Sequence, residues 1–224
     1  GVHLTALPEQ TLKKFPSFDI GVVGEGEITF YELCNAVRTK SNFTNIPGLV
    51  YRSGRDIIQT SKRPRILDQN SLPLPAWDLL PRANKYFLQT LRGCPFNCVF
   101  CMNPNGRVAR SRSVESVIEE MEILINKFHA KEFTFGDELF TVDMARSHAL
   151  MDAMIEKSFG QKIKWNCQTH VRFVEYELLS KMKKAGCYRV DLGIETGDEE
   201  KLRTLGKGTT MSNIVKAADE ARKA

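Results

Sequence analysis

Three cysteines lie within eight positions of one another, as the C-x3-C-x2-C motif of Cys94, Cys98 and Cys101. Thiolates are soft ligands, and three on one short loop can bind a zinc ion or an iron–sulfur cluster. A closed zinc site takes four protein ligands. The remaining candidates are all remote in sequence: Cys167, Cys187, His129 and His170. A cubane cluster held by only three thiolates leaves one iron open, so the spacing favours a catalytic iron–sulfur site. A non-catalytic iron–sulfur or zinc-binding module is the alternative.

The cysteine content and the net charge narrow the classes of protein to which this chain can belong. The chain has 224 residues with six cysteines, and its first residues show no basic start followed by an apolar stretch, so no signal peptide is read. Clustered cysteines without an export signal favour a reducing, cytoplasmic compartment. The formal net charge of +5 falls short of a nucleic-acid footprint, and no apolar run of about 18 residues predicts a membrane span. Without an initiator Met, the chain is expected to be part of a longer one.

The motif lies in a region of alternating strand-like and helical patterns. Short apolar runs occur at 87–91, 132–135, 163–167 and 188–194. Helical periodicity follows them at 113–128, 143–157, 175–185 and 212–221. This alternation predicts a parallel sheet with right-handed crossovers, either doubly wound or curled as a barrel. In both architectures ligands bind at the carboxyl ends of the strands, where the cysteine loop falls.

The N-terminal part is organised differently. Residues 1–40 contain a strand at 20–23, a glycine turn and a helix over 28–37, which is one βα unit and too little to close a core. Residues 41–85 predict a linker with a hairpin, turning at Ser53-Gly54, and a proline-rich segment. All nine prolines lie at or before Pro104. We therefore expect three regions, 1–40, 41–85 and 86–224.

The cysteine motif, with Phe100 just before its last cysteine and after the first strand of the repeat, resembles the radical S-adenosylmethionine enzymes. The resemblance implies that Cys94, Cys98 and Cys101 bind a 4Fe-4S cluster whose fourth iron binds S-adenosylmethionine. In this family the cluster reductively cleaves S-adenosylmethionine to a 5′-deoxyadenosyl radical, which abstracts hydrogen from substrate. The implied fold is a partial (β/α) radical-SAM barrel, TIM-like with parallel strands.

Three later strand ends carry further cofactor-binding candidates by the same resemblance. Gly136, Asp137 and Glu138 stand where the family has a Gly-Gly-Glu-like motif that meets the methionine ammonium group, with Asp137 replacing the second glycine. Arg172 is the candidate for the methionine carboxylate, with a surface arginine as the alternative. Glu195, in a segment similar to Gly-Ile-Glu-Ser, is the ribose-side candidate. Its alternative is an acid capping the short helix over 199–205.

The N-terminal region has its own resemblance, to the end of the Rossmann-like cobalamin-binding domain that precedes the barrel in one large subfamily. The residues that carry it are Gly24-Glu25-Gly26-Glu27 and the downstream Leu72-Pro73-Leu74-Pro75. The Asp-x-His-x-x-Gly motif that ligates cobalt is not in this chain, and His3 does not match it. The resemblance implies that this motif lies upstream of the present sequence, so cobalamin is expected to bind in the full-length protein and not in this chain alone.

The resemblance also implies the partners. They are a small-molecule substrate and a one-electron donor such as flavodoxin or ferredoxin, with no nucleic acid. It leaves the reaction open among methylation, ring cyclisation and methylthiolation. The family barrel has six strands and this chain offers four, so the barrel is expected to be incomplete at the C-terminus, and this fragment to be inactive alone if the missing strands complete the cofactor pocket.

Overall fold

The computed structural model describes residues 1–224 and divides into two compact units. The first contains Gly1–Leu67 with Met102–Asn105, and the second contains Asp68–Cys101 with Gly106–Ala224. Each unit has its own cluster of buried apolar side chains. No helix in either unit is both long enough and apolar enough to cross a membrane.

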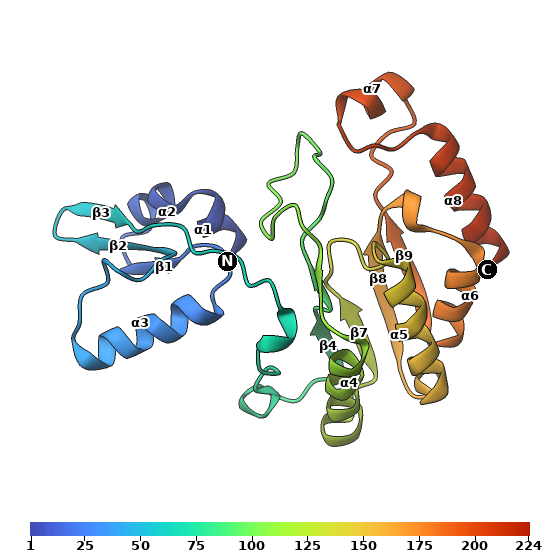
Figure 1. Ribbon diagram of the computed structural model, residues 1–224, viewed down its shortest axis with the longest axis horizontal. Helices are drawn as coiled ribbons and strands as arrows, with labels where there is room; N and C mark the ends of the chain where they lie inside the picture. Colours follow the sequence, from blue (N-terminus) through green and yellow to red (C-terminus); the bar gives the residue numbers. More distant parts are fainter. The chain divides into compact units, whose positions relative to one another are not determined.

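The first unit is a three-stranded antiparallel sheet with three helices. Its strands are β1 (Ile20–Val22), β2 (Leu49–Ser53) and β3 (Asp56–Gln59), and its helices are α1 (Val2–Ala6), α2 (Pro8–Lys14) and α3 (Glu27–Thr39) (Figure 1). The predicted hairpin is present as β2 and β3, with Ser53 opposite Asp56. β1 pairs antiparallel with β2, so the strand at Ile20 and the hairpin share one sheet. Pairing across the sheet, which local patterns do not show, joins these two segments.

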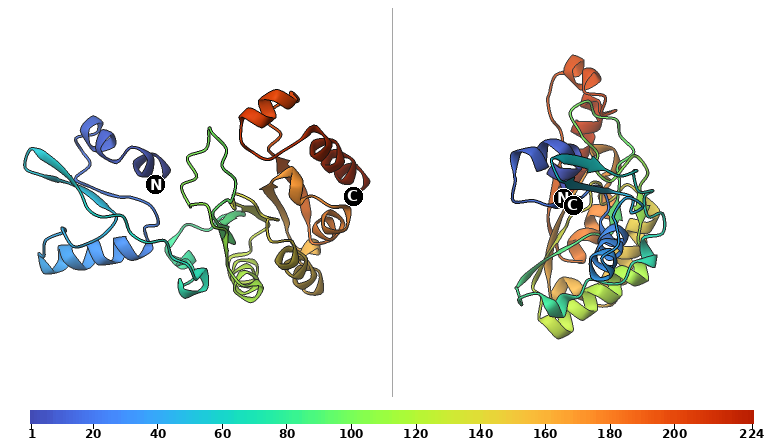
Figure 2. Two further views of the ribbon diagram at one scale, coloured as in Figure 1. Left: turned by 45° about the horizontal axis from the view of Figure 1, so that its top comes forward. Right: turned by 90° about the vertical axis from the view of Figure 1, so that its left-hand side faces the viewer.

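The second unit is an α/β structure around a parallel sheet of order β4-β7-β8-β9 (Figures 1 and 2). These strands are β4 (Lys85–Leu88), β7 (Glu132–Phe135), β8 (Lys164–Thr169) and β9 (Cys187–Leu192). The helices α4 (Val114–Phe128), α5 (Met144–Glu156) and α6 (Tyr176–Lys184) connect them, and α7 (Glu199–Thr204) and α8 (Met211–Lys223) follow β9. Four short 3-10 helices complete the unit: η1 (Gln69–Ser71), η2 (Trp77–Leu79), η3 (Phe159–Gln161) and η4 (Val171–Phe173). The predicted parallel α/β architecture is confirmed.

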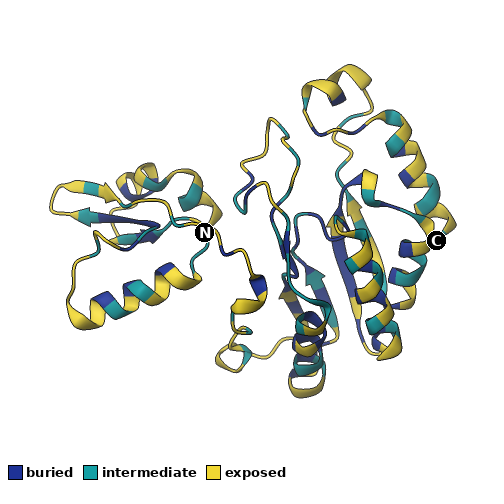
Figure 3. Ribbon diagram, viewed as in Figure 1, coloured by how far each residue is buried: buried dark blue, intermediate teal, exposed yellow.

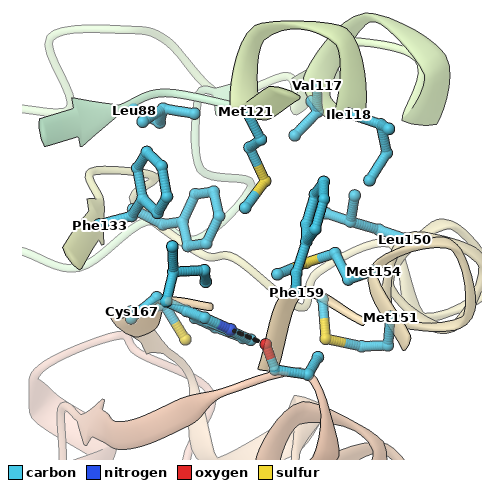
Figure 4. Packing of buried hydrophobic residues seen from close by; sticks show 14 of the residues in the cluster. Leu88, Val117, Ile118, Met121, Phe133, Leu150, Met151, Met154, Phe159 and Cys167 are labelled. Atoms are coloured by element: carbon cyan, nitrogen blue, oxygen red, sulfur yellow. Dashed lines mark hydrogen bonds between the residues drawn. The ribbon is translucent and has the colours of Figure 1, made fainter. Parts of the chain in front are cut away.

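One face of the parallel sheet packs against α4, α5 and α6. Alternate residues of β4, β7 and β8 lie in this core, so Phe133 and Phe135 of β7 are fully buried while their neighbours are less so. Trp165 of β8 and Met121 of α4 are also fully buried. Figure 4 shows Met121 among the buried side chains of this core, and Figure 3 shows buried residues along the strands of the sheet. Burying each of these side chains contributes roughly 2–3 kcal/mol. This core fixes the sheet whose carboxyl edge carries the candidate site.

Helix ends mostly follow their sequence signals. The side chain of Ser113 accepts a hydrogen bond from Ser116 N and caps α4, as its position predicts. Gly186, with φ of +99°, ends α6 as the predicted C′ glycine. The last helix begins one residue before the predicted Ser212, because Thr210 and Asn213 form a capping box.

The first predicted strand of the second unit differs from the sequence expectation of 87–91. β4 ends at Leu88, and Leu91–Arg92 form a separate strand, β5, that pairs antiparallel with β6 (Arg110–Ser111). The amide groups of Thr90 and Leu91 donate to the carboxylate of Asp137 instead of to a neighbouring strand. The chain therefore leaves the parallel sheet early and enters the cysteine loop from a short hairpin.

Candidate functional site

The three cysteines lie on the loop between β5 and β6, which rises beyond the carboxyl end of β4 and is drawn in green in Figure 1. Cys94 N donates to Gly106 O at 2.9 Å, and Cys101 N donates to Cys98 O at 3.1 Å. At its start Gly93 has a φ of +98°, and a Cβ there would lie 2.2 Å from Val108 O. The loop therefore requires glycine at this position.

The three thiols lie within electrostatic range of one another. Burial raises the pKa of the Cys94 thiol, and the negative forms of Cys98, Cys101 and Glu138 raise it further. Burial also raises the pKa of Cys98. Three thiols are one donor short of the four protein ligands of a closed zinc site, whereas a cubane held by three thiolates keeps one iron open, so this donor set fits a cluster.

Asp137, at the end of β7, ties the cysteine loop to the sheet. Its carboxylate is fully buried and accepts hydrogen bonds from Thr90 N (2.6 Å), Thr90 Oγ1 (2.6 Å) and Leu91 N (3.0 Å). Burial raises the pKa of Asp137 to about 6, although these three hydrogen bonds favour the charged form. The side chain is thus directed into the protein, and only the backbone of Asp137 remains for the predicted cofactor contact.

Glu138 and Gly136 flank this carboxylate on β7's end. Glu138 Oε2 accepts from Gly93 N at 3.2 Å, so the second carboxylate of the motif also meets the cysteine loop. Gly136 leaves room for the ring of Phe87, since a Cβ at Gly136 would lie 1.7 Å from it. The end of β7 and the cysteine loop are therefore neighbours.

His170, which follows β8, supports the loop from another side. Its ring stacks on Phe96, between the first two cysteines, with centroids 4.1 Å apart. Nδ1 accepts from Arg172 N at 3.2 Å, so Nε2 carries the proton and lies 3.2 Å from Lys207 O and 3.0 Å from Thr209 Oγ1. Burial lowers the pKa of His170 to about 4, which keeps the ring neutral.

Two further predicted cofactor-binding residues, Arg172 and Phe100, have exposed side chains at the cysteine loop. The guanidinium of Arg172 lies near Gly208, where a Cβ would be 3.5 Å from Arg172 Nη1 and 3.8 Å from the ring of Phe96. Arg172 is therefore beside the cysteine loop while its side chain stays exposed. Phe100 is 56% exposed on the loop, and no aromatic ring of the chain packs against it.

Glu195, just beyond β9, forms an ion pair that no local sequence pattern indicates. Its Oε1 lies 2.5 Å from the Nζ of Lys207. The alternative that Glu195 caps α7 is wrong, because Asp198 accepts from the amides of Glu200 and Lys201 at that helix start. Lys207 is the strongest charge that lowers the pKa of Cys98, and Glu195 acts in the opposite direction. Glu195 and the cysteine loop are therefore also within electrostatic range.

Lys207 and His170 contact predicted site residues or the cysteine loop, but the sequence did not predict them as site residues. Lys207 stands between Gly206 and Gly208, which both have positive φ, at +66° and +68°. A buried lysine between two glycines in left-handed conformations is a signal of a constrained turn that places one side chain. His170 offered no such signal, because a loop histidine usually has only local partners.

Residues 88–224 match the Radical SAM superfamily. Among curated relatives, an uncharacterized methyltransferase of Pyrococcus horikoshii is 36% identical over all of this chain and 50% of its own length. The anaerobic magnesium-protoporphyrin IX monomethyl ester cyclase of Cereibacter sphaeroides is 31% identical over all of this chain and 39% of its own length. The chain thus spans half the length of these relatives or less.

Solved structures share the fold. The cobalamin-dependent S-adenosylmethionine radical enzyme OxsB, with aqua-cobalamin and S-adenosylmethionine bound, has a TM-score of 0.83 at 22% identity, over 99% of this chain and 34% of its own. The radical S-adenosylmethionine methyltransferase TsrM of Kitasatospora setae, with cobalamin and a [4Fe-4S] cluster bound, has a TM-score of 0.80 at 18% identity, over 100% of this chain and 47% of its own.

Proposed function

This chain belongs to the radical S-adenosylmethionine superfamily, and from that premise we propose that Cys94, Cys98 and Cys101 hold a 4Fe-4S cluster that binds S-adenosylmethionine. The observation that carries the proposal is the geometry of the cysteine loop. Its three thiols lie on one loop, within electrostatic range of one another, and beyond the carboxyl end of a parallel sheet. That donor set is suited to a cluster with an open iron.

Held by Cys94, Cys98 and Cys101, the cluster would supply the one electron for reductive cleavage of S-adenosylmethionine and so the radical chemistry of this superfamily. The chain's residues bind and orient the cofactor. Glu138 and the backbone of Gly136 and Asp137 would accept from the methionine ammonium group, and Arg172 would pair with its carboxylate. Glu195 would accept from the ribose hydroxyls, and Phe100 would add an apolar contact beside Cys101.

In this proposal Asp137 and His170 fix the conformation of the cysteine loop. Asp137 holds the entry of the cysteine loop through Thr90 and Leu91, and His170 holds its middle through Phe96. Both are buried, so neither depends on solvent to keep its orientation. The loop is thereby fixed before cofactor binds, which lowers the entropic cost of ordering three ligands around a cluster.

For the whole protein we propose three regions. Residues 86–224 are the first part of a (β/α) radical-SAM barrel and 1–40 are the end of a Rossmann-like cobalamin-binding domain. Residues 41–85 connect the two and contribute the hairpin of β2 and β3 to the sheet that contains β1. The relatives named as a methyltransferase and a cyclase support methylation or ring cyclisation of a small molecule by the full-length protein, with cobalamin bound there.

Six free thiols suit a reducing cytoplasm, where flavodoxin or ferredoxin would donate the electron.

Anaerobic reconstitution with iron and sulfide tests the cluster. We expect about four irons per chain, an electron paramagnetic resonance signal after reduction, and a change of that signal on adding S-adenosylmethionine. Replacing Cys94, Cys98 and Cys101 together by alanine should remove the iron, whereas the control Cys34→Ala, an exposed thiol on α3, should keep it. Iron retained in the triple variant, bound zinc in place of iron, or a signal indifferent to S-adenosylmethionine would overturn the proposal and favour a non-catalytic metal-binding module.

A further inference from the structure

Lys207 is a buried cation with two defined acceptors. Only 8% of the residue is exposed, and its Nζ donates to Gly193 O at 2.6 Å and to Glu195 Oε1 at 2.5 Å. Burying an ammonium group is costly unless acceptors replace its water. Because both acceptors lie just after β9, the lysine side chain reaches back from the segment after α7 to the strand end.

Glu195 has a backbone conformation that needs such support. Its φ is +67°, in the left-handed region that a residue with a Cβ seldom adopts. Conformations of this kind persist where surrounding contacts impose them, and they cluster at binding sites. Lys207 holds Oε1, whereas Oε2 of Glu195 makes no hydrogen bond within the chain. One carboxylate oxygen is therefore fixed and the other is left to accept from a ligand.

Gly193 provides the space for this ion pair. A Cβ at Gly193 would lie 2.4 Å from Lys207 Nζ and 2.9 Å from Glu195 Oε1. Gly193 is not in a left-handed conformation, so an alanine there meets no backbone penalty of its own. Because Gly193 has no side chain, the Lys207 ammonium group can occupy the space in which a Cβ would lie.

The backbone around Lys207 contacts the cysteine loop. Val99 N donates to Leu205 O at 3.0 Å, and a Cβ at Gly206 would lie 3.0 Å from Asn97 O. On the other side, Lys207 O lies 3.2 Å from His170 Nε2. One short segment therefore touches the cysteine loop with its backbone and the end of β9 with a side chain.

We propose that Lys207 is a positioning residue that holds Glu195 Oε1, so that Oε2 faces the ribose hydroxyls of S-adenosylmethionine bound at the cysteine loop. This inference rests on the proposed function and adds to it a residue that acts through Glu195. In its absence, Glu195 is free to leave the left-handed conformation, and cofactor binding loses an oriented acceptor.

The test measures the dissociation constant of S-adenosylmethionine by titrating the electron paramagnetic resonance signal of the reduced, cluster-loaded chain. Lys207→Met keeps the apolar stem and removes the charge, and we expect binding to weaken about 10- to 100-fold, as for loss of a charge-assisted hydrogen bond. Glu195→Gln should weaken binding similarly. The double variant should bind no more weakly than Glu195→Gln alone, because the lysine acts through that carboxylate.

Two further variants keep the test decisive if Lys207→Met fails to fold or loses its cluster. Gly193→Ala displaces the ammonium group without changing either charge, and should weaken binding in the same way. Lys201→Met removes an exposed lysine on α7 and should leave binding unchanged. Unchanged binding in Gly193→Ala and Lys207→Met, or effects of Lys207→Met and Glu195→Gln that multiply, would overturn the inference. A wild-type signal that ignores S-adenosylmethionine would instead overturn the proposed function.

Discussion

The imidazole of His170 lies nearly parallel to the ring of Phe96, at an interplanar angle of 12°. This stack joins the middle of the cysteine loop to the segment that follows β8. The hydrogen bonds of His170 then extend the contact to Lys207 and Thr209, beyond α7. Loops from three strand ends meet at one buried side chain, so its loss should affect the whole carboxyl edge of the sheet.

His170→Phe should destabilise the second unit. Phenylalanine can keep the stack on Phe96, but it leaves the amide of Arg172 and the carbonyl of Lys207 without their partner. We expect a loss of about 1–3 kcal/mol in the free energy of unfolding. Denaturant unfolding followed by tryptophan fluorescence reports on this unit, because Trp77 and Trp165 both lie in it. A variant as stable as the wild type would show that the hydrogen bonds of His170 contribute nothing net.

Acid should remove the advantage of histidine over phenylalanine at position 170. The folded pKa of His170 is lowered to about 4 from 6.5, so its contribution to stability is complete above pH 6.5 and is lost as the pH falls toward 4. The difference in unfolding free energy between wild type and His170→Phe should shrink by about 1.4 kcal/mol per pH unit across this range. Asp137, whose raised pKa acts in the opposite direction, is common to both proteins. A difference that stays constant with pH would contradict the buried neutral imidazole.

Asp137→Ala should loosen the entry of the cysteine loop. It leaves the buried amides of Thr90 and Leu91 without an acceptor, which should cost about 2–4 kcal/mol. Asp137→Asn keeps one acceptor oxygen and should lose less. Asp191→Ala is a matched control, since its carboxylate is exposed and paired only with Arg189. Thermal unfolding of the three variants checks the order, and an equal loss from Asp137→Ala and Asp191→Ala would refute it.

Two glycines with positive φ should differ in their tolerance of alanine. At Gly93 a Cβ would lie 2.2 Å from a backbone carbonyl, whereas at Gly208 the nearest atom is 3.5 Å away, in ordinary contact. Gly208→Ala should cost about 1 kcal/mol from its backbone conformation alone. Gly93→Ala adds a clash with backbone and should cost about 2 kcal/mol more. Comparable unfolding free energies for the two variants would show that the cysteine loop shifts without penalty.

Gly136→Ala should be rescued by a second substitution. The new Cβ would meet the ring of Phe87, which is 61% exposed and not part of the core. We expect Gly136→Ala to cost about 1–3 kcal/mol, and Phe87→Ala to recover most of that loss in the double variant. A double variant no more stable than Gly136→Ala would place the strain in the backbone of β7 instead. Unfolding free energies of the four proteins complete the cycle.

Local sequence was sufficient to predict much of this molecule. Hydrophobic periodicity predicted the parallel strands and the helices α4, α5 and α6, because each buries one face against a common core. The cap of α4 at Ser113 and the glycine that ends α6 are local signals as well. The C-x3-C-x2-C spacing placed three thiols on one loop, since eight consecutive positions cannot lie far apart.

Tertiary structure decided how the polar residues are used. Asp137 stands in a motif expected to face a cofactor, yet its carboxylate bonds to Thr90, 47 positions earlier. Glu195 was expected either to bind a ribose or to cap a helix. It instead forms an ion pair with Lys207, and its own backbone is in the left-handed conformation. Such partners are set by sheet register and by the crossing of loops, which no local pattern encodes. A buried polar atom must bond to whatever donor the fold brings within reach, so its role becomes visible only once the chain is folded.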